Sequence, residues 1–274
     1  MVVNLGGVTA GQLSLLVGGV ESHVLFVAAA MLFSLALLPT SLSTRPAPAP
    51  VRRAHLDLAG LFTLSPLGAA ACLAVGAVNG AFTTLGAVFL TAAGYGVAEV
   101  ALLMSAALIG GAVIQVPLGR LSDRLDRRWM LAATAATAAA VATLLDAWRP
   151  SDLAAALAVL FLLGGAVFSL YGLAVAHAND RAAPEAFVET AGGLLLLFGI
   201  GSIAGPLAAS AAMGVVRPGV LLTFMTCVHL GLALYALWRI VRTPAVPRAE
   251  REHFAAMTGN ATPGAVALDP RANE

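Results

Sequence analysis

The chain has 274 residues, of which 59% are hydrophobic and 11% are charged, and its mean hydropathy is +0.91. A soluble domain with so apolar a surface would aggregate, so this composition excludes that class and predicts a polytopic membrane protein. The formal net charge of +1 gives no sign of a nucleic-acid partner.

Two apolar segments open the chain. Residues 1–19 are apolar and rich in glycine, and no basic residue precedes the apolar part, so we interpret them as a membrane span rather than a signal peptide. A second span is predicted over 23–42. The segment 43–64 alternates proline with alanine and carries three arginines, which favours an extended cytoplasmic linker.

Six further apolar segments have about the 20 residues that an α-helix needs to cross the hydrocarbon core of a bilayer. They cover 65–90, 97–118, 129–147, 153–177, 187–213 and 219–241. We therefore expect an all-α transmembrane helical bundle of about eight spans.

The distribution of arginine predicts the orientation of these spans. All 15 basic residues are arginine, and only Arg149 and Arg217 fall in the loops on one side of the predicted membrane. The other thirteen lie toward the opposite side, which places both termini in the cytoplasm by the positive-inside rule. The tail 243–274 carries prolines among small and charged residues without apolar periodicity, so we expect it to be disordered.

The most informative stretch is 119–128, which lies between two of the predicted spans. Its sequence, GRLSDRLDRR, contains six charged side chains. Gly119 follows Pro117 and is expected to release the chain from the helix into a tight turn. Asp123 is expected to face either the N-terminus of a neighbouring helix or the arginines that follow it.

This stretch resembles motif A of the major facilitator superfamily, in which glycine is followed by three residues, aspartate, a basic residue, one residue, glycine and two basic residues. The matching positions are Gly119, Asp123, Arg124, Arg127 and Arg128. Asp126 stands where the motif has its second glycine, so we expect a different turn and a second acid that competes with Asp123 for the arginines. The resemblance implies a latch between helix ends. The alternative is a solvated loop whose arginines only enforce orientation.

The resemblance also implies a layout for the chain. Two spans lie between the linker and the motif and four follow it, so 65–242 resembles the second six-helix half of a twelve-helix permease. The two spans in 1–42 then correspond to the last two helices of the first half. We expect four earlier helices to be missing, with Met1 an internal start, and we expect such a fragment to associate with itself.

Polar side chains inside spans are costly and are therefore candidates for a solute-binding cavity. In the superfamily the first helix of each triplet lines this cavity, which here means 65–90 and 153–177. The candidates are Asn79, Thr83, Thr84, Gln115, Tyr171 and His177, with Asn179 and Asp180 at the inner end of the later span. Hydrogen bonding within or between helices is the alternative role for Asn79 and the two threonines. For His177 the alternative is a cation at a helix C-terminus, whereas a coupling proton would need this ring or an acid in the missing part.

Small residues precede a proline in the middle span of each triplet. In the later triplet they are Gly201 and Gly205, followed by Pro206, and we expect these residues to permit close helix packing and a kink. Cys72 and Cys227 fall inside apolar runs and are expected to pack there. Because no hydrolase, metalloprotease or P-loop motif is present, we expect no enzyme, no metal and no cofactor.

The sequence and the resemblance together predict a secondary transporter of a small solute in the bacterial inner membrane, working by alternating access. The alternative is a truncated membrane protein or interaction module that keeps the half-bundle without transporting.

Overall fold

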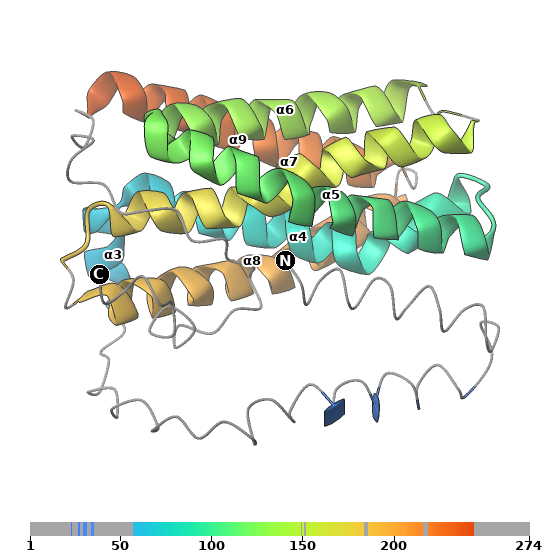
Figure 1. Cartoon of the computed structure of the whole chain (residues 1–274), viewed down its shortest axis with the longest axis horizontal. Helices are drawn as coiled ribbons and strands as arrows, with labels where there is room; N and C mark the ends of the chain where they lie inside the picture. Colours follow the sequence, from blue (N-terminus) through green and yellow to red (C-terminus); the bar gives the residue numbers. More distant parts are fainter. Residues whose placement is uncertain are drawn as a thin grey trace. The chain divides into compact units, whose positions relative to one another are not determined.

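The computed structural model describes residues 57–148, 150, 152–183, 186–215 and 219–243, together with positions 23, 27, 30, 31, 34 and 35 (Figure 1). The chain divides into two compact units, formed chiefly by Ala54–Glu274 and by Val2–Arg53. The described helices from α3 onward belong to the first unit. The two spans predicted in 1–42, most of the linker 43–64 and the tail after Thr243 lie outside the described residues.

Six of the helices described are long and apolar enough to cross a membrane, and no strand occurs in these ranges. They are α4 (Pro66–Ala92), α5 (Val97–Arg124), α6 (Arg127–Trp148), α7 (Leu153–Asn179), α8 (Phe187–Val215) and α9 (Val220–Arg242), preceded by the short helix α3 (Leu58–Leu64). The predicted all-α, membrane-spanning fold is confirmed, and each of the last six predicted spans corresponds to one helix.

Short polar side chains start several of these helices. Asp57 accepts from the Gly60 N–H at the start of α3, and Asp152 accepts from the Ala155 N–H at the start of α7. The Ser65 hydroxyl accepts from the Gly68 N–H, and Pro66 occupies the first turn of α4, where its missing N–H costs nothing. These caps place the first turns of the spans.

The helices pack as two related triplets, α4–α6 and α7–α9. The first helix of each triplet packs mainly against the middle helix of the other, so that α4 lies along α8 and α7 lies along α5, while α6 packs against α9. Helix α7 is the most buried of the six, because 56% of the residues in its apolar stretch are buried, compared with 28% for α8. Large faces of α8 therefore stay open to a lipid or protein neighbour.

Glycines bring the backbones together at both crossings. On α8, a Cβ at Gly205 would collide with the Ala77 carbonyl of α4, and one at Gly201 would collide with the Leu73 carbonyl. The α5–α7 crossing repeats this arrangement, since a Cβ at Gly110 would meet the carbonyl oxygen of Phe161. Gly201 and Gly205 thus lie where close approach excludes any side chain.

Candidate functional site

The charged stretch 119–128 proves to be mostly helical. Helix α5 continues to Arg124 and α6 begins at Arg127, so the turn between them consists of Leu125 and Asp126. The prediction that Gly119 starts the turn is wrong, because this residue is buried within α5, where its carbonyl accepts from the Ser122 hydroxyl at 2.7 Å. Charged side chains at the end of a span tolerate helical geometry, so the helix outlasts the apolar run.

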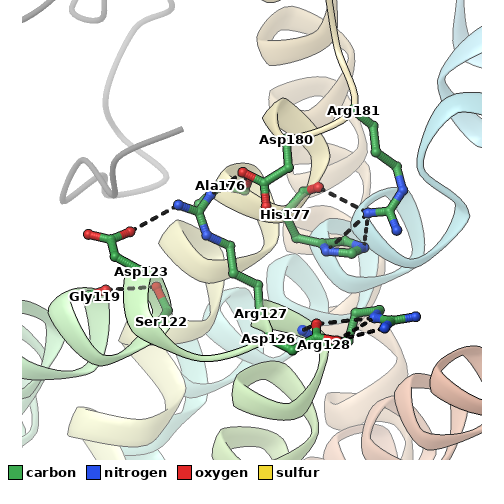
Figure 2. A network of polar contacts seen from close by, with 10 residues as sticks. All are labelled: Gly119, Ser122, Asp123, Asp126, Arg127, Arg128, Ala176, His177, Asp180 and Arg181. Carbon is green, nitrogen blue, oxygen red and sulfur yellow. Dashed lines mark hydrogen bonds and ion pairs between the residues drawn. The ribbon is translucent and has the colours of Figure 1, made fainter. Parts of the chain in front are cut away.

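Arg127 is the centre of the site, and its side chain is 1% exposed. One terminal nitrogen donates to the Asp180 carboxylate at 2.8 Å and to the Ala176 carbonyl oxygen at 2.7 Å. The other donates to Asp123 at 3.0 Å (Figure 2). A single guanidinium therefore joins the end of α5, the start of α6 and the C-terminal end of α7.

The two acids that Arg127 joins differ in burial. The side chain of Asp180 is 3% exposed, whereas that of Asp123 is 28% exposed. Removing one member of a buried, hydrogen-bonded ion pair leaves an uncompensated charge, which costs about 3–5 kcal/mol, whereas an exposed pair is worth about 0–1 kcal/mol. The contact with Asp180 is thus the stronger link of the two.

Asp126 binds the other buried arginine of the motif. Its carboxylate accepts from the backbone N–H of Arg128 at 3.0 Å and from two guanidinium nitrogens, at 3.1 and 2.6 Å. Arg128 also donates to the carbonyl of Thr243, the residue that ends α9. Asp123 and Asp126 therefore divide the two arginines between them, and Asp126 contacts the first turn of α6 where the motif has glycine.

The remaining basic residues of the stretch are exposed. Arg124 lies in the last turn of α5 and makes no ion pair within the described ranges. Of the five positions that match the motif, Asp123, Arg127 and Arg128 take part in ion pairs. Gly119 is a buried residue of α5.

His177 lies in the last turn of α7, 4% exposed, with a terminal nitrogen of Arg181 at 3.0 and 3.3 Å from its two ring nitrogens (Figure 2). A guanidinium only donates, so the ring nitrogen that it contacts must accept, as neutral imidazole does. Burial lowers the pKa of Arg181, and the positive charge of Arg128 lowers it further. This end of the bundle therefore carries closely spaced positive charges.

The other cavity candidates are dispersed over three helices. Thr83 and Thr84 are exposed on α4, and the Thr83 hydroxyl donates to the Asn79 carbonyl one turn earlier at 2.7 Å. The Asn79 side-chain oxygen is buried and has no hydrogen-bond partner among the described residues. Gln115 on α5 and Tyr171 on α7 are buried, and the Tyr171 ring meets that of Phe198 edge to face, with centroids 4.8 Å apart.

Sequence reasoning missed the pairing of Asp180 and the part played by Ala176. In the sequence, Asp180 is one of several polar residues at the inner end of a predicted span, 53 positions from Arg127. A signal was nonetheless present, because the end of α7 and the arginine-rich turn are predicted on the same side of the membrane, and an acid there is a natural partner for a buried arginine. No metal-binding group of His, Cys, Asp or Glu occurs in the part of the chain that the structure describes.

Comparison with known proteins identifies a family. The model of the Major Facilitator Superfamily matches residues 67–269. An uncharacterized MFS-type transporter YcaD of Escherichia coli O17:K52:H18 is 31% identical over 140 residues, which cover 51% of this chain and 35% of the relative. The YcaD of Salmonella typhi is 28% identical over 178 residues, covering 65% and 45%. The chain thus matches less than half the length of these relatives, and no solved structure matches it.

Proposed function

The chain belongs to the Major Facilitator Superfamily, and from this premise we propose that it moves a small solute across the bacterial inner membrane by alternating access. We further propose that α4–α9 form the second half of the transporter, and that the described bundle has a transport role rather than an enzymatic one. The observation that carries the proposal is the guanidinium of Arg127, which is buried between Asp123, Asp180 and the Ala176 carbonyl.

The mechanism follows from where these bonds lie. Alternating access requires helices to change their relative positions around a central site. Arg127 ties the α5–α6 turn to the end of α7, so a movement of α7 relative to this turn would break these bonds. The network then biases the equilibrium by its difference in energy between the two arrangements, which is what a latch does.

A test of the latch does not need the substrate. In a Cys227→Ala background, Thr83→Cys reports on access to α4 through its labelling rate with a membrane-impermeant maleimide, since Cys72 is buried. We expect Asp180→Asn to change this rate severalfold and Arg124→Gln, an exposed control, to leave it unchanged. Equal rates in all three proteins would contradict the latch.

The second candidate function is a membrane protein or interaction module that does not transport. Its support is that Thr83 and Thr84 are exposed in the described bundle, and that Asn79 has an unpartnered oxygen there. The two exposed threonines suit a partner protein or a second copy of the chain as well as a solute. Saturable uptake by vesicles containing the purified chain would exclude this candidate, and its absence in well-folded protein would favour it.

Proton coupling, if the transporter uses it, falls to His177 within the described bundle. A proton can bind the ring only if the ring gives up its contact with Arg181, so protonation and the position of the α7 end would be linked. We expect His177→Gln to abolish uptake driven by a pH gradient while preserving exchange across the membrane. Unchanged gradient-driven uptake would remove this residue from the coupling mechanism.

The orientation is proposed from the arginines. The α5–α6 turn and the end of α9 should face the cytoplasm, and the α4–α5 turn, which contains Gly94 at φ 99°, should face outward. A cytoplasm-active reporter fused after Leu125 or Arg248 should be active, and one fused at Gly94 should be silent. The reverse result would invert the topology.

A further inference from the structure

A small pocket lies beside the Arg127 network, at the same end of the bundle. It is lined by the first turn of α4, the start of α6, the end of α7 and the end of α9. The lining residues are Ser65, Pro66, Leu67, Arg128, His177, Arg181, Arg239 and Thr243. Four elements from both triplets therefore converge on it, and three of its eight residues are arginine.

The charges around this pocket do not balance. Arg128 is paired with Asp126, but neither Arg181 nor Arg239 has a carboxylate at ion-pair distance in the described part of the chain. The N-terminal end of α4, a long helix, adds its partial positive charge at Ser65. Burial lowers the pKa of Arg181, Arg128 and Arg239 lower it further, and the carboxylates of Asp180 and Asp126 act in the opposite direction from a greater distance than an ion pair.

The polar groups that line the pocket are held in place. Ser65 is fully buried, and its hydroxyl accepts from the Gly68 N–H, which leaves its own hydrogen free to donate. Arg128 is 5% exposed and fixed by Asp126, and His177 is 4% exposed and contacts Arg181. Preorganised donors of this kind suit an acceptor-rich anion better than a neutral solute.

We propose that this arginine pocket binds a phosphate-type oxyanion, either the headgroup of an anionic phospholipid or free phosphate. The enclosed part has room for about one water molecule. A single phosphate oxygen therefore enters, and the rest of the group stays at the mouth between Arg181 and Arg239. The pocket shares His177 with the cavity candidates, but its other lining residues lie at the ends of the spans, near the expected depth of lipid headgroups.

The test uses the full chain in nanodiscs of phosphatidylcholine, with and without phosphatidylglycerol. Native mass spectrometry counts the retained phosphatidylglycerol, and thermal unfolding in pure phosphatidylcholine discs compares inorganic phosphate with chloride at equal ionic strength. We expect Arg239→Gln and Arg181→Gln each to weaken binding by at least about tenfold, since each removes a charged hydrogen-bond donor from the anion. Arg239→Lys, which keeps the charge, should retain most of the binding.

Arg120→Gln is the matched control, because it also removes one arginine charge, from an exposed position near the C-terminal end of α5, at the same end of the bundle as the pocket. Retention of phosphatidylglycerol that only the pocket variants lose would identify a headgroup site. Stabilisation by phosphate alone, lost in the same variants, would identify a site for free phosphate. The proposal is overturned if neither probe binds, or if Arg120→Gln weakens binding as much as Arg239→Gln does. Thermal unfolding without ligand shows whether each variant is folded.

Discussion

The two ends of the six-helix bundle are held together by different chemistry. At the α5–α6 end, two buried arginines make three ion pairs and connect α5, α6, α7 and the end of α9. At the opposite end, the Tyr95 hydroxyl donates to the Pro150 carbonyl at 2.6 Å, and the Glu99 carboxylate accepts from the Gly96 N–H. The charged end has strong, directional ion pairs, whereas the opposite end, called the Tyr95 end, depends on apolar packing and on hydrogen bonds such as that from Tyr95 to Pro150.

This difference is consistent with the proposed latch, in which the charged end would act as a switch. Ion pairs are sensitive to geometry, so a small displacement of α7 relative to the α5–α6 turn changes their energy steeply. Apolar contacts between helices tolerate sliding much better. Substitutions at the charged end, at the helix crossing and at the Tyr95 end test this comparison.

The largest effect is expected for Arg127→Met, which removes the central cation. Asp180, with its side chain 3% exposed, would lose its ion-pair partner, and the Ala176 carbonyl would lose a donor. We expect the free energy of unfolding in detergent to fall by about 3–5 kcal/mol. The exposed control Arg124→Met should change it by less than about 0.5 kcal/mol. A small loss for Arg127→Met would mean that the charged end contributes no more to the free energy of unfolding than the Tyr95 end does.

Next in size is the contrast between the two acids that bind Arg127. Asp180→Asn should lower the free energy of unfolding by about 2–3 kcal/mol, because a buried charge-assisted bond is replaced by a neutral one. Asp123→Asn should lower it by less than about 1 kcal/mol, since this carboxylate is 28% exposed. High salt should weaken the Asp123 contribution but not that of Asp180. Equal losses would show that burial does not decide the strength of these contacts.

How far the sequence predicts this molecule depends on the range of the interactions. Span positions follow from local hydropathy, so the apolar cores of α4–α9 are predicted correctly. The ends near the charged turn are misplaced, because α5 runs to Arg124 although the apolar run stops near Leu118. The turn at Leu125 and Asp126 then brings Asp123 at the end of α5 next to Arg127 at the start of α6.

Contacts between distant residues are not predictable in this way. The Asp180 carboxylate meets Arg127 only because α7 packs against α5 and α6, which no local pattern encodes. Likewise, Gly205 is expected from the sequence to allow close packing, but its partner, the Ala77 carbonyl of α4, follows from the fold. The proposed solute site also stays a prediction, since its candidate residues are spread over α4, α5 and α7.

The third prediction concerns the close crossing of α4 and α8, which lies between the two ends. Gly205→Ala should cost about 1–3 kcal/mol, because the added Cβ collides with the backbone of α4. Gly199→Ala, on the same helix with nothing within 4 Å, should be neutral or stabilise α8 by up to about 1 kcal/mol. Thermal unfolding of the two variants measures both changes in stability. Equal stabilisation by the two substitutions would show that α4 and α8 do not approach closely.

The smallest effect is expected at the Tyr95 end, for Tyr95→Phe. This change removes a single hydrogen bond to the Pro150 carbonyl and should cost about 0.5–1.5 kcal/mol.

Burial raises the pKa of Tyr95, and the nearby Glu99 carboxylate raises it further, so the folded state favours the protonated phenol. The stability that Tyr95 contributes is therefore fully present below the ordinary tyrosine pKa of about 10, and it declines at higher pH, where the unfolded chain ionises first. The unfolding free energies of the unmodified protein and the Tyr95→Phe variant should accordingly differ by a constant amount up to that pH and converge above it. A difference that changes near neutral pH would instead show that a group other than Tyr95 titrates at this end, and the contrast between the charged end and the Tyr95 end would fail.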